Sequence, residues 1–431
     1  MSGAPPRALV LAIGEELLQA RIADGNSAWL ARALLELGFE VRRMLTVGDA
    51  DGDLLRALQE YDGAVAAIVS SGGLGPTVDD RVRAESAACT GAPLADVPGA
   101  VAELARLFEK RYGRAAPDPY LAQARVPRGA RALANAAGTA WAFAARLPHG
   151  SLHLALPGPP GEMRAAFESG GGRAALQELV RGPSPLRCLA LHTAGQPESA
   201  VEARIHDLLA GSRNPVFGIT ANADAVTVSA LARAEEGGRS AEQVLAEAEA
   251  ELRARLGDLC WGRDEETLAD VVVRQLVAAR ATVAVAESCT GGRIAGALTA
   301  VPGASAVFGA GWIAYANEAK SRDLGIAEEL LRSRGAVSEE VAVAMAECAR
   351  RRAGATWSVS ATGIAGPDGG SAEKPVGLVW IGLAGPHGAY AVRRQQWARA
   401  GRASILRQCV RDALDALRRE LGGLPRLPSR E

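Results

Sequence analysis

The feature that most constrains the fold is a short segment in the C-terminal third, where an apolar run meets small polar residues and glycines. Residues 281–286 are apolar and partly β-branched, residues 293–300 have helical composition, and between them stand Ser288, Cys289, Thr290, Gly291 and Gly292. This order predicts a buried strand, a tight loop and a helix. Backbone N–H groups at such a helix start have no helical acceptor. The loop is therefore predicted to hold an anion, or to stabilise an oxyanion beside a nucleophile.

A simpler interpretation is that Ser288 or Thr290 only caps the helix, as Ser and Thr often do. The lysine content favours chemistry instead. Among 48 Lys and Arg residues, only Lys110, Lys320 and Lys374 are lysines. Lysine loses its proton readily on burial, whereas arginine stays charged. A neutral Lys320 beside a serine hydroxyl would activate that serine as a nucleophile.

A second glycine-rich loop follows another apolar, β-type run. It contains Thr362 and Gly363 and extends to Gly370. Glycine allows a ligand to approach backbone N–H groups closely. Two such loops and a retained lysine together predict one site.

Composition narrows the class of protein. A chain of 431 residues exceeds a single core and predicts two or three domains. The net charge of −1 argues against a direct nucleic-acid partner, and the absence of an uncharged apolar stretch of about 18 residues argues against a membrane span. The six cysteines form no CxxC pair, so reduced thiols in the cytoplasm are expected.

Residues 8–165 alternate strand-like and helix-like segments, which predicts a mostly parallel sheet covered by helices. The third strand is followed by a loop that contains Gly72, Gly73, Gly75, Thr77, Asp79 and Asp80. Ligands of open α/β sheets bind beyond the carboxyl ends of the strands, so a phosphate-bearing ligand is expected here. The two aspartates could hold a divalent cation beside the phosphates, or they could cap the next helix.

Five motifs of this half resemble the molybdopterin-binding-like domain that opens CinA proteins. They are Gly14–Leu18, Asp24–Ser27, Ser71–Asp80, Asn135–Ala140 and Leu156–Met163. The resemblance implies either metal-dependent hydrolysis of ADP-ribose or binding of a pterin phosphate. It assigns Asp80 to a divalent metal ion, with Asp79 and Asp49 as further acidic partners. Family members usually have glycine where Ala20 stands, and loss of a glycine restricts φ.

Residues 166–185 contain two breaks, Gly170–Gly172 and Arg181–Pro185, and the second is the better linker candidate. A small α+β unit follows, with strands predicted at Cys188–Thr193 and Ala225–Ala232 and helices between and after them. It resembles the middle domain of longer CinA proteins, and a spacer or assembly role is expected.

The C-terminal motifs resemble the CinA C-terminal domain, which is similar to the PncC-type nicotinamide mononucleotide deamidases. These motifs are Ala286–Gly292, Tyr315–Lys320, Ala361–Gly370 and Lys374–Trp380. The resemblance implies hydrolysis of the carboxamide of nicotinamide mononucleotide to nicotinate mononucleotide and ammonia, without a cofactor.

The residues fit that reaction. Ser288 would attack the amide carbon, Lys320 would take its proton, and Tyr315 would relay or orient the proton. The N–H groups of Cys289, Thr290, Gly291 and Gly292 would receive the oxyanion. Thr362 and the loop from Gly363 would hold the substrate, and Arg402 is the first candidate for its phosphate. This chain is one residue longer than family members over residues 397–402, so Arg399 and Arg407 remain alternatives to Arg402 for binding the phosphate.

The predicted fold class is α/β. The predicted domains are a molybdopterin-binding-like α/β domain over 5–170, a small α+β middle domain over 185–262 and an α/β amidase domain over 264–422. Within them a helix is predicted over 26–37 and a strand over 388–395, and the tail over 422–431, with Pro425 and Pro428, is expected to be disordered. The competing hypothesis is a non-catalytic nucleotide- or pterin-binding regulatory protein linked to competence or DNA damage. Expected partners are small-molecule nucleotides and, by analogy with the family, a second copy in a homodimer.

Overall fold

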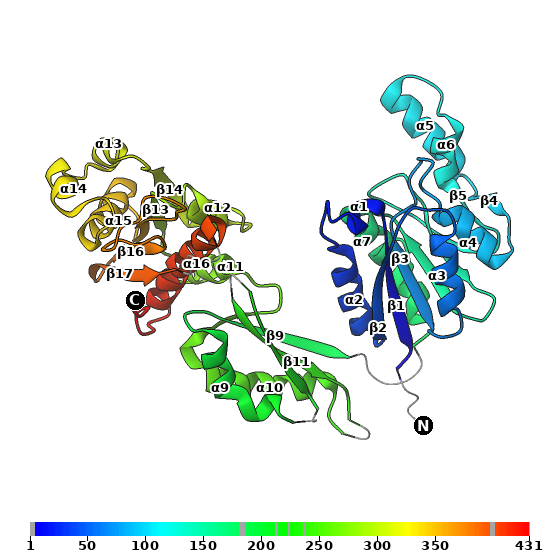
Figure 1. The fold of residues 1–431 in the computed structure, drawn as a ribbon, viewed down its shortest axis with the longest axis horizontal. Helices are drawn as coiled ribbons and strands as arrows, with labels where there is room; N and C mark the ends of the chain where they lie inside the picture. The colour runs from blue at the N-terminus through cyan, green and yellow to red at the C-terminus, as the bar shows by residue number, and fades with distance from the viewer. Residues whose placement is uncertain are drawn as a thin grey trace. The chain divides into compact units, whose positions relative to one another are not determined.

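The computed structural model describes residues 5–180, 186–211, 214–222, 225–235, 238–396 and 401–430. They form two compact units, one from residues up to Arg187 with Ala232–Val244, the other from Cys188–Leu231 and from Leu245 onward (Figure 1). Among the described helices, none is both long and apolar enough to cross a membrane. The linker candidate Arg181–Pro185 lies outside the described residues.

The first unit is built on a six-stranded sheet in the order β2-β1-β3-β8-β7-β6. Its strands are β1 (Arg7–Ile13), β2 (Glu40–Val47), β3 (Ala67–Ser71), β6 (Arg131–Leu133), β7 (Ala142–Arg146) and β8 (Leu152–Leu156). The four strands β2, β1, β3 and β8 are parallel, and β7 and β6 continue antiparallel. The predicted, mostly parallel sheet is confirmed.

Helices cover both faces of this sheet, as a strand buried along its whole length, such as β3, requires. They are α1 (Glu15–Leu18), α2 (Asn26–Leu37), α3 (Asp53–Tyr61), α4 (Val82–Thr90), α5 (Ala100–Tyr112), α6 (Asp118–Leu121), η1 (Ala122–Ala124), α7 (Pro160–Glu168) and α8 (Gly172–Gln177), with a separate ribbon of β4 (Leu94–Asp96) and β5 (Arg125–Pro127). One core lies beneath α2 and α7, and the other beneath α3, α4 and α5. The parallel strands thus end together at one edge of the sheet.

Two backbone positions shape that edge. Ala20 has a φ of 54°, so this alanine adopts the left-handed conformation that glycine adopts without strain. Gly72 has a φ of 117°, and a Cβ there would lie 2.2 Å from the carbonyl oxygen of Ile13. Close packing between two strand ends therefore requires Gly72.

The middle segment forms a four-stranded sheet in the order β10-β11-β9-β12. Its elements are β9 (Arg187–Thr193), α9 (Glu198–Leu209), β10 (Val216–Ala221), β11 (Val226–Ala232), α10 (Ala241–Leu256), η2 (Gly257–Leu259) and β12 (Cys260–Arg263). The residues of β11 are alternately buried and half-buried, so one face packs on helices and the other is partly exposed. The predicted α+β character is confirmed, although β10 and β12 were not predicted.

The C-terminal part has a five-stranded sheet in the order β14-β13-β15-β16-β17. Its elements are α11 (Leu268–Ala278), β13 (Val283–Glu287), α12 (Arg293–Thr299), η3 (Ala304–Ala306), β14 (Phe308–Ile313), α13 (Asn317–Ala319), the π-helical turn η4 (Lys320–Leu324), α14 (Glu328–Arg334), α15 (Glu339–Ala353), β15 (Trp357–Gly363), β16 (Leu378–Gly385), β17 (Gly388–Gln395) and α16 (Gly401–Leu421). Strands β14, β13 and β15 are parallel, and β16 and β17 are antiparallel additions.

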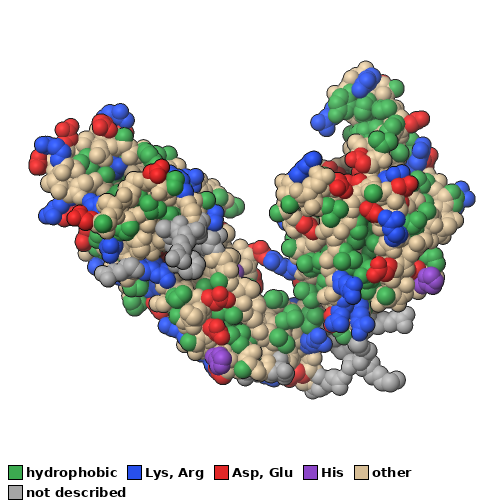
Figure 2. Space-filling model, in the orientation of Figure 1, with side chains coloured by type: hydrophobic (Ala, Val, Ile, Leu, Met, Phe, Trp, Pro, Cys, Tyr) green, Lys and Arg blue, Asp and Glu red, His purple; other side chains and the backbone are tan. Residues whose placement is uncertain are grey.

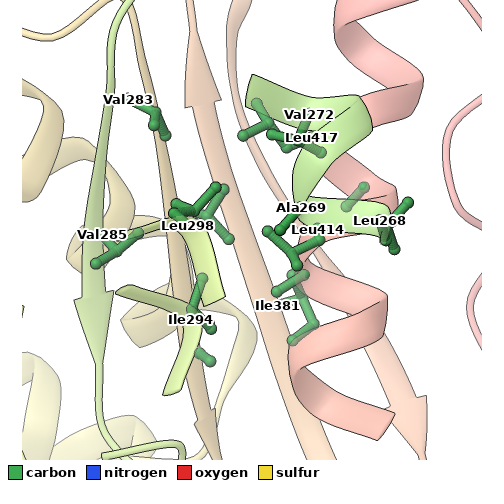
Figure 3. Close-up of a cluster of buried hydrophobic side chains, with 14 of the residues drawn as sticks. Leu268, Ala269, Val272, Val283, Val285, Ile294, Leu298, Ile381, Leu414 and Leu417 are labelled. Carbon is green, nitrogen blue, oxygen red and sulfur yellow. The ribbon is translucent and has the colours of Figure 1, made fainter. Parts of the chain in front are cut away.

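Successive side chains of β13 point to opposite faces of the sheet, and both faces are buried. Val283 and Val285 point towards Ile294 and Leu298 of α12, in a core that α11 and α16 complete (Figure 3). Ala284 and Ala286 belong to the opposite core, beneath α15. Since the strand is held on both sides, the loop that follows it begins from a rigid element.

The C-terminal tail corrects one expectation. Residues 422–431 were expected to be disordered because of their prolines, yet those up to Arg430 are placed against β17 and α16. Arg430 exchanges two backbone hydrogen bonds of 3.0 Å with Arg393 and Gln395. The Arg394 guanidinium donates to the Pro428 carbonyl at 2.6 Å, and Leu427 is buried in the core. Backbone pairing and one apolar anchor therefore order the tail.

Candidate active site

The ends of neighbouring strands bring the serine and the lysine together. Ser288 follows β13 directly, and its N–H donates to the Ala361 carbonyl of β15 at 2.9 Å. Lys320 lies where α13 passes into η4, after the end of β14. The distance from Lys320 Nζ to Ser288 Oγ is 3.0 Å. Thirty-two residues separate the two side chains in sequence, and the parallel pairing of β13 and β14 makes them meet.

Lys320 is 1% exposed and is held by backbone oxygens. Its Nζ lies 3.0 Å from the Ala314 carbonyl and 3.1 Å from that of Tyr315. Burial lowers the Lys320 pKa, against smaller opposing effects of Cys289 and Glu318. Within the described parts of the chain, no carboxylate forms an ion pair with this lysine. The neutral amine is therefore favoured relative to a lysine in water.

The three contacts of Lys320 suit a base. As an ammonium, it donates to both carbonyls and to Ser288 Oγ. As a neutral amine, it has two N–H groups and one lone pair. The carbonyls of Ala314 and Tyr315 accept the two N–H groups, which leaves the lone pair facing Ser288 Oγ. This arrangement can take a proton from the serine hydroxyl.

The alternative that Ser288 or Thr290 caps the helix is wrong. The N-cap of α12 is Gly292, with no side-chain cap. The Ser288 hydroxyl lies instead beside Lys320 and, at 3.5 Å, the Tyr315 carbonyl. The Thr290 hydroxyl is buried without a partner among the described residues.

The predicted oxyanion donors divide into two pairs. The Gly291 N–H donates to the Ser288 carbonyl at 3.1 Å, and the Gly292 N–H donates to Glu287 at 2.9 Å. Those two groups already have acceptors, so the expectation for Gly291 and Gly292 is wrong. No other described residue supplies an acceptor to the N–H groups of Cys289 and Thr290. They are the donors left for an oxyanion.

The side chains of Tyr315 and Arg402 meet at the rim of the site. The Arg402 guanidinium donates to the Tyr315 hydroxyl at 3.2 Å and to the Gly366 carbonyl at 2.8 Å. The carbonyl of Tyr315, not its hydroxyl, contacts Lys320, so the geometry does not support a relay through the Tyr315 ring. Arg402 joins the tyrosine to the second glycine loop, whereas Arg407 is exposed on α16. Arg399 lies outside the described residues.

Thr362 and Gly363 have structural contacts of their own. The Thr362 hydroxyl donates to the Ala336 carbonyl at 2.7 Å, and the residue is 1% exposed. A Cβ on Gly363 would lie 2.7 Å from the Leu378 carbonyl oxygen, so this glycine allows β15 and β16 to pack. Contact with substrate through the Thr362 hydroxyl is therefore not supported.

A second candidate site is a cavity of about 610 Å³ in the first unit, at the ends of β1, β3 and β8. Gly72, Gly73 and Gly75 line it, as predicted from their place after the third strand, whereas Thr77 is not among its lining residues. Six carboxylates also line it: Glu16, Asp24, Asp49, Asp79, Asp80 and Glu162. Of the described residues around it, none is a lysine, arginine or histidine. Figure 2 shows acidic side chains, in red, at this end of the unit.

The predicted metal ligands share this cavity. Burial raises the Asp49 pKa most, and the charges of Glu16, Asp79 and Asp80 raise it further. However, within the described ranges no three His, Cys, Asp or Glu side chains are grouped to hold a metal ion. Asp80 accepts from the N–H and hydroxyl of Thr77, at 2.8 and 2.5 Å. The N-cap of α4 is Arg81, with no side-chain cap, so the capping alternative for Asp79 and Asp80 is wrong.

Known families match each part of the chain. Residues 9–172 match the probable molybdopterin binding domain, 190–262 the damage-inducible protein CinA KH domain and 265–421 the CinA C-terminal domain. A putative competence-damage inducible protein of Symbiobacterium thermophilum is 40% identical over 422 residues, covering 95% of this chain and 98% of that protein. The chain belongs to the CinA family.

Other CinA relatives have comparable similarity. A CinA-like protein of a Synechococcus strain is 40% identical over 412 residues, and the matched region covers 96% of this chain and 97% of the Synechococcus protein. The crystal structure of a competence/damage inducible protein from Agrobacterium tumefaciens is 41% identical, with a TM-score of 0.34, and covers 36% of this chain and 97% of its own. The resemblance predicted from the motifs is confirmed.

One residue of the site was missed by the sequence analysis. Glu287, the last residue of β13, is 1% exposed, and its carboxylate accepts three backbone hydrogen bonds from the start of α12. Period-2 alternation places it on the same face as Val283 and Val285. The sequence does place this carboxylate on the strand face that the start of the next helix covers, and that position could have indicated its contacts.

Proposed function

We propose that the C-terminal domain is a nicotinamide-nucleotide amidase, which hydrolyses nicotinamide mononucleotide to nicotinate mononucleotide and ammonia. The observation that carries the proposal is the 3.0 Å contact between Lys320 Nζ and Ser288 Oγ, with the lysine buried. Membership of the CinA family supports it, since residues 265–421 match the CinA C-terminal domain and the sequence motifs there resemble those of the PncC-type deamidases.

The reaction would proceed in two halves. Neutral Lys320 takes the hydroxyl proton of Ser288 while Oγ forms a bond to the carboxamide carbon. The oxyanion is received by the N–H groups of Cys289 and Thr290, a contribution of about 3 kcal/mol per donor in comparable sites. The C–N bond then breaks, and ammonia leaves with the proton from Lys320. Water then attacks the ester carbon while Lys320 takes one of its protons. The bond from carbon to Ser288 Oγ breaks, Lys320 returns that proton to Oγ, and the product leaves as the carboxylate.

The substrate's negative group requires a cation. Arg402 is a candidate because it lies at the rim beside Tyr315 and Gly366. Its contacts there are one neutral hydroxyl and one carbonyl, which a phosphate could replace by charge-assisted hydrogen bonds. Arg402 would thus select the nucleotide over the nucleoside.

Product analysis tests this proposal. The full-length protein, without added metal, is incubated with nicotinamide mononucleotide or with nicotinamide riboside. We expect ammonia and nicotinate mononucleotide in equal amounts from the nucleotide, and a much slower reaction with the riboside. No ammonia from either compound, with the protein folded, would refute the amidase.

A second activity is proposed for the first unit. The acidic cavity would admit a phosphate-bearing ligand such as ADP-ribose only together with cations, because its described walls hold six carboxylates and no basic side chain. Asp49, Asp79 and Asp80 line this cavity without forming a ready group of three ligands, so a divalent ion brought in with the phosphates would have to contact them one or two at a time. Release of ribose 5-phosphate and AMP from ADP-ribose, dependent on Mg²⁺ or Mn²⁺, would support it. Binding of a nucleotide or pterin without turnover would favour the regulatory alternative, which the competence-damage names of relatives suggest.

A further inference from the structure

Glu287 is a buried carboxylate that the proposed reaction does not use. Its Oε2 accepts from the N–H groups of Gly292 at 2.9 Å and Ile294 at 3.1 Å. Its Oε1 accepts from the N–H of Ala295 at 2.8 Å. Within the described part of the chain, no lysine or arginine forms an ion pair with it. Backbone N–H groups and the helix dipole therefore balance this charge.

These contacts change what the glycine loop can bind. The N–H groups at the start of a helix following a glycine loop ordinarily receive a phosphate or another anion. Here the protein's own carboxylate already occupies those of Gly292, Ile294 and Ala295. A substrate phosphate entering this position would meet a buried negative charge. Two described cations lie beside this loop: Arg293 donates to the Thr290 carbonyl at 2.9 Å, and Arg402 lies at the rim beside the Tyr315 hydroxyl.

The same contacts fix the serine. Glu287 and Ser288 are adjacent, and the turn between them and Gly292 is closed by the Gly291 N–H to Ser288 carbonyl bond. The carboxylate ties the far end of this turn back to the strand. The N–H groups of Cys289 and Thr290 lie between the two anchors, and no other described residue supplies them with an acceptor. The N–H groups of Gly292, Ile294 and Ala295 are thus taken by Glu287, whereas those of Cys289 and Thr290 stay available to an oxyanion.

We propose that Glu287 is a positioning residue, which holds the turn from Ser288 to Gly292 in its reactive conformation and excludes anions from the start of α12. This inference rests on the proposed function only where it concerns rate. A displacement of about 1 Å in a catalytic group can lower a rate about 100-fold. Loss of the carboxylate should therefore lower kcat about 100-fold and leave KM nearly unchanged.

The test compares Glu287→Ala, Glu287→Gln and a matched control, Glu328→Gln, which alters an exposed carboxylate in the first turn of α14. Formate is then added to each, with chloride at equal ionic strength as the salt control. We expect formate to restore kcat in Glu287→Ala, because it can occupy the vacated N–H groups, but not in Glu287→Gln, whose amide fills the space. Unchanged kcat in both Glu287 variants, or recovery with chloride as much as with formate, would overturn the proposal.

Hydrogen exchange gives a readout that needs no turnover. The peptide containing Gly292–Ala295 should exchange at least about tenfold faster in Glu287→Gln than in the wild type, because one oxygen acceptor becomes a donor. A peptide from β17 should exchange equally in both. If the wild type releases no ammonia but this difference is found, the amidase is refuted while the anchoring role stands. Equal exchange at Gly292–Ala295 would refute the anchoring role itself.

Discussion

His153 on β8 provides a quantitative prediction of how stability depends on pH. The ring is fully buried, with Nε2 2.9 Å from Ser70 Oγ and Nδ1 3.2 Å from Ser86 Oγ. Phe143 packs edge-on against it, at 5.9 Å between ring centroids. Burial lowers the His153 pKa from 6.5 to about 3, so the folded first unit keeps this histidine neutral at pH 5.

The direction of the pH effect on stability follows from how many protons the folded and unfolded chains bind. At pH 5 the unfolded chain protonates His153 and the folded chain does not, so lowering the pH favours unfolding. The contribution is fully present above about pH 6.5 and is lost as the pH falls towards 3. Between pH 7 and pH 5 this linkage removes about 2 kcal/mol, equivalent to about 30-fold in the opening equilibrium.

Hydrogen exchange of the peptide containing β8 measures this opening within the full-length protein. After correction for intrinsic exchange, the wild type should lose about 2 kcal/mol more between pH 7 and pH 5 than His153→Gln does. The matched control is His206→Gln, whose ring is 76% exposed and which should follow the wild type. Equal pH dependence in the wild type and His153→Gln would refute the argument that burial keeps His153 neutral.

Three further predictions concern the second unit. Lys320→Arg should lower kcat for ammonia release at least about 100-fold, because arginine remains protonated and cannot act as the base. The control variant Lys374→Arg should keep the wild-type kcat. In the wild type, kcat should fall as the pH is lowered through the depressed Lys320 pKa. Arg402→Ala should raise KM for nicotinamide mononucleotide about tenfold or more, with a smaller change for the riboside; an equal change for both would contradict phosphate binding. Leu427→Ala should destabilise the unit by about 2–4 kcal/mol in urea unfolding, whereas Ser429→Ala should have no effect; an unchanged midpoint in Leu427→Ala would mean that the tail does not anchor the core.

Sequence patterns predicted the regular elements well. The helix Asn26–Leu37 and the strand Gly388–Gln395 were predicted with the bounds found. Strands β10 and β12 were missed because each is short and partly exposed, and pairing with neighbouring strands rather than an apolar run defines them. The tail was misjudged because backbone pairing, not composition, orders it.

The site was predicted in part. Parallel strands explain why Ser288 and Lys320 meet, and a retained lysine was a sound signal. Sequence could not show that the Tyr315 carbonyl, rather than its hydroxyl, contacts Lys320, because that depends on the turn after β14. Nor did it show that Glu287 occupies N–H groups otherwise available to a ligand. Which backbone N–H groups lack a hydrogen-bond acceptor depends on the folded structure and cannot be deduced from the order of residues. The domain boundaries and the roles of the site residues remain predictions.

The central claim is that Ser288 is the nucleophile of an amidase. The most direct test is the initial rate of ammonia release from nicotinamide mononucleotide by the wild type and by Ser288→Ala, at equal concentration and without metal, with Ser333→Ala as the control for an exposed helical serine. We predict release by the wild type and by Ser333→Ala, and a rate at least about 1000-fold lower for a folded Ser288→Ala. Release by Ser288→Ala at the wild-type rate would contradict the account.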